Sequence, residues 1–260
     1  MTITNTEAVT DKQEPASNEP GSGANPKAFF SCRDVHAYYN ESYIVQGVSF
    51  DIAEREIVAL LGRNGAGKTS TLRAIARADD PVIRSGEIYL QGKSIHDLVA
   101  YQASQAGIQL VPEDRCIIPG LTVEENLFLA QIAEPTGWSL DRIYQHFPRL
   151  EERRKQDAVT LSGGEQQMLA VARALARDIK LLLLDEPYEG LAPVIVHEIE
   201  GILQEVKEAG ITTVIVEQNA IAALKLADSA IILDTGVIAF RGSAQEVLDN
   251  EDLRHEYLAL

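Results

Sequence analysis

Strand-like and helix-like patterns alternate along most of the chain. Seven short runs are typical of β-strands: 47–52, 56–62, 86–92, 107–112, 180–187, 212–218 and 229–234. The apolar stretches EIVALL, KLLLLD and TTVIVE lack the alternation of a half-exposed strand, which favours strands covered on both faces in a parallel sheet. Helical patterns separate them at 68–77, 164–177 and 194–210, the last ending in Gly210 as a C-cap. The sequence therefore predicts an α/β fold.

The same patterns suggest how the chain is divided. Residues 1–27 are polar and rich in Pro, Gly, Asn and Glu, so they predict a disordered tail before a domain over 28–260. Roughly 95–175 carries helical patterns and few strands, which indicates a mostly helical subdomain inserted into the α/β core. The strands that precede it are expected to form an N-terminal β subdomain.

Composition narrows the classes of protein. The formal net charge of −16 disfavours nucleic acid and anionic lipid as partners, since both need a basic face. There is no apolar run of about 18 residues and no signal-peptide pattern, so we expect a cytosolic protein. The two cysteines, Cys32 and Cys116, lack metal-ligand spacing and are expected to be reduced.

One glycine-rich segment follows a buried strand and opens a helix. Its residues fit the phosphate-binding pattern G-x-x-x-x-G-K-[ST], the P-loop: Gly62, Arg63, Asn64, Gly65, Ala66, Gly67, Lys68 and Thr69, followed by Ser70. Lys68 would supply charge to terminal phosphates, and the Thr69 hydroxyl would ligate Mg²⁺. An ordinary strand–helix turn is the alternative, but the strand before and the helix after favour nucleotide binding.

Two acidic residues end the strand LLLLDE. Asp185 is well placed to hold Mg²⁺ beside the P-loop, and Glu186 to act as a general base on water. A helix N-cap acid with an exposed neighbour is the competing interpretation. The presence of a P-loop in the same chain favours catalysis.

A second glycine-rich helix start lies about a hundred residues after the first. The segment LSGGEQQ (161–167), with Ser162 as N-cap and Glu165 three residues on, fits a capping box. Together with the P-loop and the acidic strand end, it resembles the signature motif of the ATP-binding-cassette ATPases, over roughly 29–260. The resemblance implies a P-loop NTPase core that binds ATP and Mg²⁺.

In that family two cassettes pair head to tail, so the signature of each chain meets the nucleotide of the other. The resemblance therefore implies that Ser162, Gly163, Gly164 and Glu165 serve a partner's ATP. The partner is either a homologous ATPase or a second copy of this chain. The segment 111–126 is implied to lie near the groove that receives a permease, and its Pro112, Pro119 and Gly120 predict a shaped loop.

The resemblance also places single residues. Tyr39 matches the aromatic that stacks on adenine, with adjacent Tyr38 as the competing choice and a surface aromatic as the alternative role. Three positions depart from the common pattern. Glu113 replaces a glutamine that ligates Mg²⁺, Gln218 replaces a histidine at the γ-phosphate, and Ala192 replaces an aspartate in the dimer-contact loop YEGLAP.

The motifs that contain these three positions resemble those of one branch of the family, the ATP-binding subunits of importers for branched-chain amino acids, urea or short amides. That branch implies permease subunits, a periplasmic solute-binding protein, and a position at the inner face of the membrane. The alternatives are a soluble cassette ATPase in a non-transport process and an exporter ATPase, for instance for a lipid. These motifs indicate the class of transporter rather than the transported solute, because other subunits select the solute.

Overall fold

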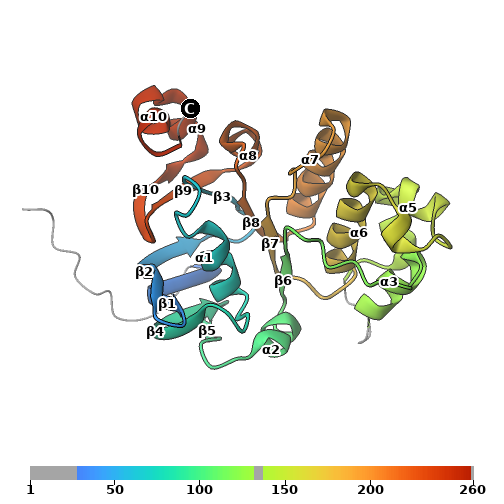
Figure 1. Cartoon of the computed structure of the whole chain (residues 1–260), viewed down its shortest axis with the longest axis horizontal. Helices are drawn as coiled ribbons and strands as arrows, with labels where there is room; N and C mark the ends of the chain where they lie inside the picture. Colours follow the sequence, from blue (N-terminus) through green and yellow to red (C-terminus); the bar gives the residue numbers. More distant parts are fainter. Residues whose placement is uncertain (1–27, 132–136, 259–260) are drawn as a thin grey trace, which may run out of the picture.

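The computed structural model describes residues 28–131 and 137–258, so the tail predicted at 1–27 lies outside the described residues. Two sheets organise the chain (Figure 1). One is antiparallel, in the order β2-β1-β4-β5, and the other has the order β10-β9-β3-β8-β7-β6. The strands are β1 (Phe30–Tyr39), β2 (Ser42–Ile52), β3 (Ile57–Leu61), β4 (Val82–Leu90), β5 (Lys93–Ser94), β6 (Ile108–Val111), β7 (Leu181–Asp185), β8 (Thr212–Val216), β9 (Ser229–Asp234) and β10 (Val237–Ser243).

Helices cover both sides of the larger sheet and form a separate lobe beyond β6 and β7 (Figure 1). They are α1 (Lys68–Ile75), α2 (Ala100–Gln105), α3 (Val123–Ala130), α4 (Leu140–His146), α5 (Pro148–Glu152), the 3₁₀ turn η1 (Ala158–Thr160), α6 (Gly163–Leu175), α7 (Pro193–Glu208), α8 (Ala220–Leu226), α9 (Ala244–Asp249) and α10 (Glu251–Leu258). Within the described ranges, no helix is long and apolar enough to cross a membrane.

The buried strands lie where the apolar runs predict. Every residue of β3, β7 and β8 is buried, and the strands from β9 to β6 run parallel, with β10 antiparallel at the edge. The expected α/β class and P-loop NTPase fold are confirmed. Gly210 follows α7 with φ of +89°, the left-handed conformation expected after a helix C-terminus.

Three strands were not expected from the sequence: β1, β10 and the two-residue β5. In β1, Asp34 has φ of +47° and the pairing register shifts between Cys32 and Val35, so a bulge interrupts the alternation that marks a strand. In β10, the register shifts between Ile238 and Phe240, and the strand lies at an exposed edge with no fully buried residue.

The lobe beyond the sheet is built around α6. Helices α3 and α5 contact α6, and the apolar cluster at this end includes Leu127, Trp138, Phe147 and Leu169. Residues 95–175 also contain β6, which pairs with β7 and so belongs to the larger sheet. Within the segment 111–126, for which a shaped loop was predicted, 112–122 carry no helix or strand, whereas Val111 ends β6 and 123–126 form the start of α3.

Candidate functional site

The P-loop is a tight turn between β3 and α1. Gly67 caps α1 with φ of +97°, and Gly62 has φ of +144°. A Cβ on Gly62 would lie 2.3 Å from the Leu233 carbonyl oxygen, so only glycine fits there. The first N–H groups of α1 have no partner within the helix, which makes this helix start suited to an anion.

Lys68 lies inside the curve of that loop. Its ammonium donates hydrogen bonds to the carbonyl oxygens of Gly62 at 3.0 Å and Arg63 at 3.3 Å. The residue is only 6% exposed, and burial lowers the pKa of Lys68, against the opposing effect of Glu186 and Asp185. The loop therefore holds one cation where phosphate oxygens would be received.

Asp185 and Thr69 meet across the site. The Thr69 hydroxyl donates to Asp185 Oδ1 at 2.9 Å, joining the start of α1 to the end of β7. Asp185 is buried, and burial raises its pKa. A hydroxyl and carboxylates are the hard oxygen donors that Mg²⁺ prefers, so the residues present fit that ion.

Glu186 is held in an uncommon backbone conformation, with φ of +49°. Its N–H donates to the Val216 carbonyl oxygen at 2.9 Å, and its carboxylate accepts a 2.8 Å hydrogen bond from Gln218 Nε2. Burial raises the pKa of Glu186, and the neighbouring Glu189 adds to the effect. The carboxylate is thereby aimed and made more basic, as a general base requires.

Two more carboxylates join the site, Glu113 from the loop after β6 and Glu189 from the loop after Glu186. Oxygens of Glu113, Glu186 and Glu189 all lie within 4.8 Å of one another. Burial raises the pKa of Glu113, and the charge of Glu189 raises it further. Sequence reasoning missed Glu189, although it lies within the quoted loop YEGLAP; its acidic type beside Glu186 was the available signal.

A cavity of about 420 Å³ connects these groups. Ile44, at which the sequence gave no signal, is part of its wall. The other lining residues are Tyr39, Asn64, Gly65, Gly67, Lys68, Thr69, Ser70, Glu113, Glu186 and Gln218. Four other residues belong to the same loop and strand but do not line the cavity: Gly62, Arg63, Ala66 and Asp185. The volume is in the range of small-molecule sites.

The two tyrosines at the end of β1 differ in their surroundings. Tyr39 lines the cavity, whereas Tyr38 stacks on Tyr43 with ring centroids 4.6 Å apart. The Arg84 guanidinium lies 4.3 Å from the centroid of the Tyr38 ring. Tyr38 is thus engaged on the sheet surface, and Tyr39 is the residue available to a nucleotide base.

The signature segment, residues 161–167, caps α6. Ser162 Oγ accepts from the Glu165 N–H at 3.4 Å, and Glu165 Oε2 accepts from the Ser162 N–H at 2.9 Å, the predicted capping box. Arg153 Nε donates to Glu165 Oε1 at 2.5 Å. None of these residues lines the nucleotide cavity, and Figure 1 shows α1 and α6 in different parts of the fold.

The two signature glycines have different neighbours. A Cβ on Gly164 would lie 2.9 Å from Ile195 Cγ2 of α7, so packing inside this chain requires glycine there. A Cβ on Gly163 would meet only the Arg115 guanidinium, at 3.5 Å. Packing within this chain therefore accounts for glycine at 164 but not at 163.

Known proteins are similar to this chain in sequence and in fold. A family model described as "ABC transporter" matches residues 45–189. The chain is 41% identical over 227 residues to the high-affinity branched-chain amino acid transport ATP-binding protein BraG of Pseudomonas aeruginosa, covering 86% of this chain and 97% of BraG. It is 37% identical to the probable branched-chain amino acid transport ATP-binding protein LivF of Archaeoglobus fulgidus, over 84% of this chain and 93% of LivF.

More distant relatives carry other names. The lipopolysaccharide export system ATP-binding protein LptB of Escherichia coli is 31% identical, over 89% of this chain and 97% of LptB. A solved structure described as the dimeric structure of a bacterial ABC transporter cassette aligns with a TM-score of 0.72 and 26% identity, over 83% of this chain and 98% of that one. The family model covers more than half of the chain, and the alignments with these relatives cover more than four fifths of it. This chain therefore belongs to the ABC transporter family, as an ATP-binding subunit that hydrolyses ATP.

Proposed function

We propose that this chain powers an importer for branched-chain amino acids or related amides. The observation that carries the proposal is the 41% identity to BraG, which extends over 97% of that relative. The relatives named for lipopolysaccharide export are less similar, at 31%. The acidic net charge of −16 argues against a nucleic-acid partner.

The main residues in and around the cavity have the following roles in this proposal. Lys68 and the P-loop N–H groups bind the terminal phosphates, and Tyr39 stacks on the base. Thr69, Asp185 and Glu113 hold Mg²⁺, which when bound neutralises charge on the phosphates. Glu186 takes a proton from the attacking water, and Gln218 orients the Glu186 carboxylate through their hydrogen bond. Gln218 keeps a donor but does not titrate, so its role is positional.

The signature segment is proposed to serve a second cassette. Ser162 and Gly163 are exposed at the start of α6, and neither lines the cavity of their own chain. Unpaired N–H groups and the positive end of the helix dipole suit this surface to another chain's phosphate. A pair of such chains then closes on two nucleotides, and hydrolysis releases them.

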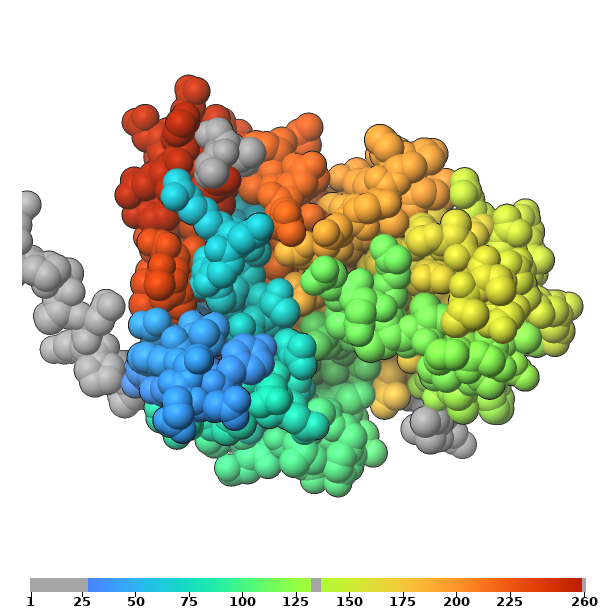
Figure 2. Space-filling model, in the orientation of Figure 1, coloured from blue at the N-terminus to red at the C-terminus, as the bar shows by residue number. Residues whose placement is uncertain are grey.

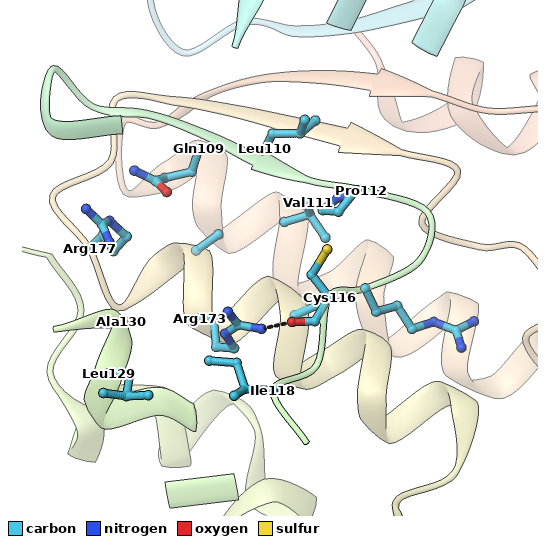
Figure 3. Close-up of a pocket in the computed structure, with 13 residues that line it drawn as sticks. Gln109, Leu110, Val111, Pro112, Cys116, Ile118, Leu129, Ala130, Arg173 and Arg177 are labelled. Carbon is cyan, nitrogen blue, oxygen red and sulfur yellow. Dashed lines mark hydrogen bonds between the residues drawn. The ribbon is translucent and has the colours of Figure 1, made fainter. Parts of the chain in front are cut away.

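A permease is proposed to dock in a groove of about 380 Å³ between β6, the loop after it, and α6, which we call the α6 groove. Its lining includes Pro112, Cys116, Ile118 and Leu129, with Arg173 donating to the Cys116 carbonyl oxygen at 2.5 Å (Figure 3). Residues around 110–120, in green, reach the surface between the N-terminal strands, in blue, and the helical lobe, in yellow (Figure 2). Ile118 and Leu129 line this groove and are therefore suitable sites for crosslinking to a permease.

The complex isolated from its native membrane tests the proposal. Affinity purification of this chain from detergent-solubilised membranes should recover permease subunits. In proteoliposomes, the ATPase rate of that complex should rise with a binding protein loaded with leucine, urea or a short amide. Recovery of lipid-export components would favour the exporter alternative, and recovery of ribosomal or DNA partners the soluble one.

A further inference from the structure

Arg115 joins three segments that the proposed mechanism treats separately. It lies in the loop after β6, two residues from Glu113, with φ of +61°. Its Nε donates to Gln167 Oε1 of α6 at 3.0 Å, and its Nη2 makes a long 3.5 Å contact with the Glu189 carbonyl oxygen. One side chain therefore contacts the nucleotide-side loop, the signature helix and the loop after the general base.

These contacts fix where the guanidinium points. Gln167 is 2% exposed, so the Nε anchor is a buried and ordered group. With Nε and Nη2 occupied, Nη1 is the atom nearest the Gly163 position, 3.5 Å from where a Cβ would lie. The other atoms found near that Cβ position, at 3.9 Å, also belong to the Arg115 guanidinium.

The surroundings of the Arg115 guanidinium suit it to bind an anion. The chain carries a net charge of −16, yet a planar guanidinium is held at the exposed start of α6, beside N–H groups that favour anions. Guanidinium groups bind phosphate oxygens through charge-assisted hydrogen bonds. The absence of a side chain at Gly163 leaves the guanidinium open to a phosphate that approaches the signature.

We propose that Arg115 binds the terminal phosphate of the nucleotide held by the P-loop of a second copy of this chain, beside Ser162 and Gly163. The inference rests on the proposed pairing of two cassettes and adds a side-chain cation to the signature's backbone donors. Arg115 also lines the α6 groove, so an occupant of that groove contacts the same residue that reaches the partner's nucleotide.

The test measures ATP-driven association. The Glu186→Gln chain, which binds ATP without hydrolysing it, should form dimers with MgATP in sedimentation velocity experiments. Adding Arg115→Gln should weaken that association about 10²- to 10⁴-fold, since a hydrogen bond to a charged group, worth about 10- to 100-fold, is lost at each of the two composite sites. ATP binding to the isolated chain, measured by calorimetry at concentrations below association, should change less than about twofold.

Two further variants separate charge from structure. Arg115→Lys keeps the cation and should retain most of the association, whereas a fall as large as that of Arg115→Gln would overturn the charge argument. Arg177→Gln removes the same charge from the lining of the α6 groove without touching Gly163, and should leave association unchanged. Equal losses for Arg177→Gln and Arg115→Gln would overturn the proposal. If the Glu186→Gln chain does not dimerise with MgATP, both the proposed composite site between two copies and the proposed role of Arg115 are refuted. If the chain that also carries Arg115→Gln still dimerises as tightly, only the proposed role of Arg115 is refuted.

Discussion

Alanine at residue 164 is expected to destabilise the isolated chain for a reason unrelated to nucleotide. The new Cβ would lie 2.9 Å from Ile195 Cγ2 and 3.1 Å from Ile195 Cγ1. Ile195 is 9% exposed on α7, and a β-branched side chain in a helix has little rotamer freedom to move aside. The contact therefore forces a shift of α6 against α7.

The size of the effect follows from two opposing contributions. Overpacking a core by one carbon costs about 1–3 kcal/mol. Replacing a helical glycine by alanine returns up to about 1 kcal/mol. With the full return subtracted, the net loss is up to about 2 kcal/mol, which corresponds to a fall of up to about 8 °C in Tm for a chain of this size.

A double-mutant cycle measures the energetic coupling between residues 164 and 195. Thermal or urea unfolding is followed for four chains: the native chain, Gly164→Ala, Ile195→Ala and the double variant. Removing both γ carbons of Ile195 should abolish the penalty, giving a coupling energy of about 1–3 kcal/mol. An equal penalty in the Ile195→Ala background would refute the steric account. Gly163→Ala is the matched control: its Cβ would lie 3.5 Å from Arg115 Nη1, an ordinary van der Waals contact, so its Tm should not fall, while ATP-driven association should.

Three other changes test the nucleotide site. Lys68→Ala removes the buried ammonium and should weaken MgATP binding about 10- to 100-fold in calorimetry of a folded variant; unchanged affinity would contradict the role of Lys68. Glu186→Gln should keep ATP binding and lose about 10²–10⁴-fold in steady-state hydrolysis, and near-normal turnover would mean that another group activates the water. Burial raises the pKa of Glu217 from 4.5 to about 7, so the folded chain keeps a proton there that the unfolded chain releases. Stability should therefore fall as the pH rises from 4.5 to 7, and Glu217→Gln should flatten that slope in urea titrations at several pH values.

Local patterns were enough to predict the elements that carry the site. The wholly apolar runs of β3, β7 and β8 reflect burial on both faces, which the sequence displays directly. The start of α6 was predictable because Ser162 and Glu165 form a capping box that needs no distant partner. For the same reason the P-loop could be placed between β3 and α1.

Contacts between distant segments were not predictable. Arg115 meets Gln167, and Gly164 meets Ile195, because loops and helices far apart in the sequence pack together. No periodicity or capping rule encodes either pair. The strand β1 was missed for a local reason instead, since the bulge at Asp34 breaks the two-residue repeat.

The charges around the P-loop indicate that nucleotide binding and the pairing of two chains are linked. Asp185, Glu186, Glu113 and Glu189 surround the site, and Lys68 is the cation among its lining residues. A triphosphate adds further negative charge, which repels these carboxylates at short range. A divalent cation offsets part of that repulsion, and the start of α6 from a second chain brings positive potential to the far side of the nucleotide. Because the second chain relieves repulsion that the first cannot, we expect ATP to bind the paired chains more tightly than the isolated one, and each equilibrium to strengthen the other.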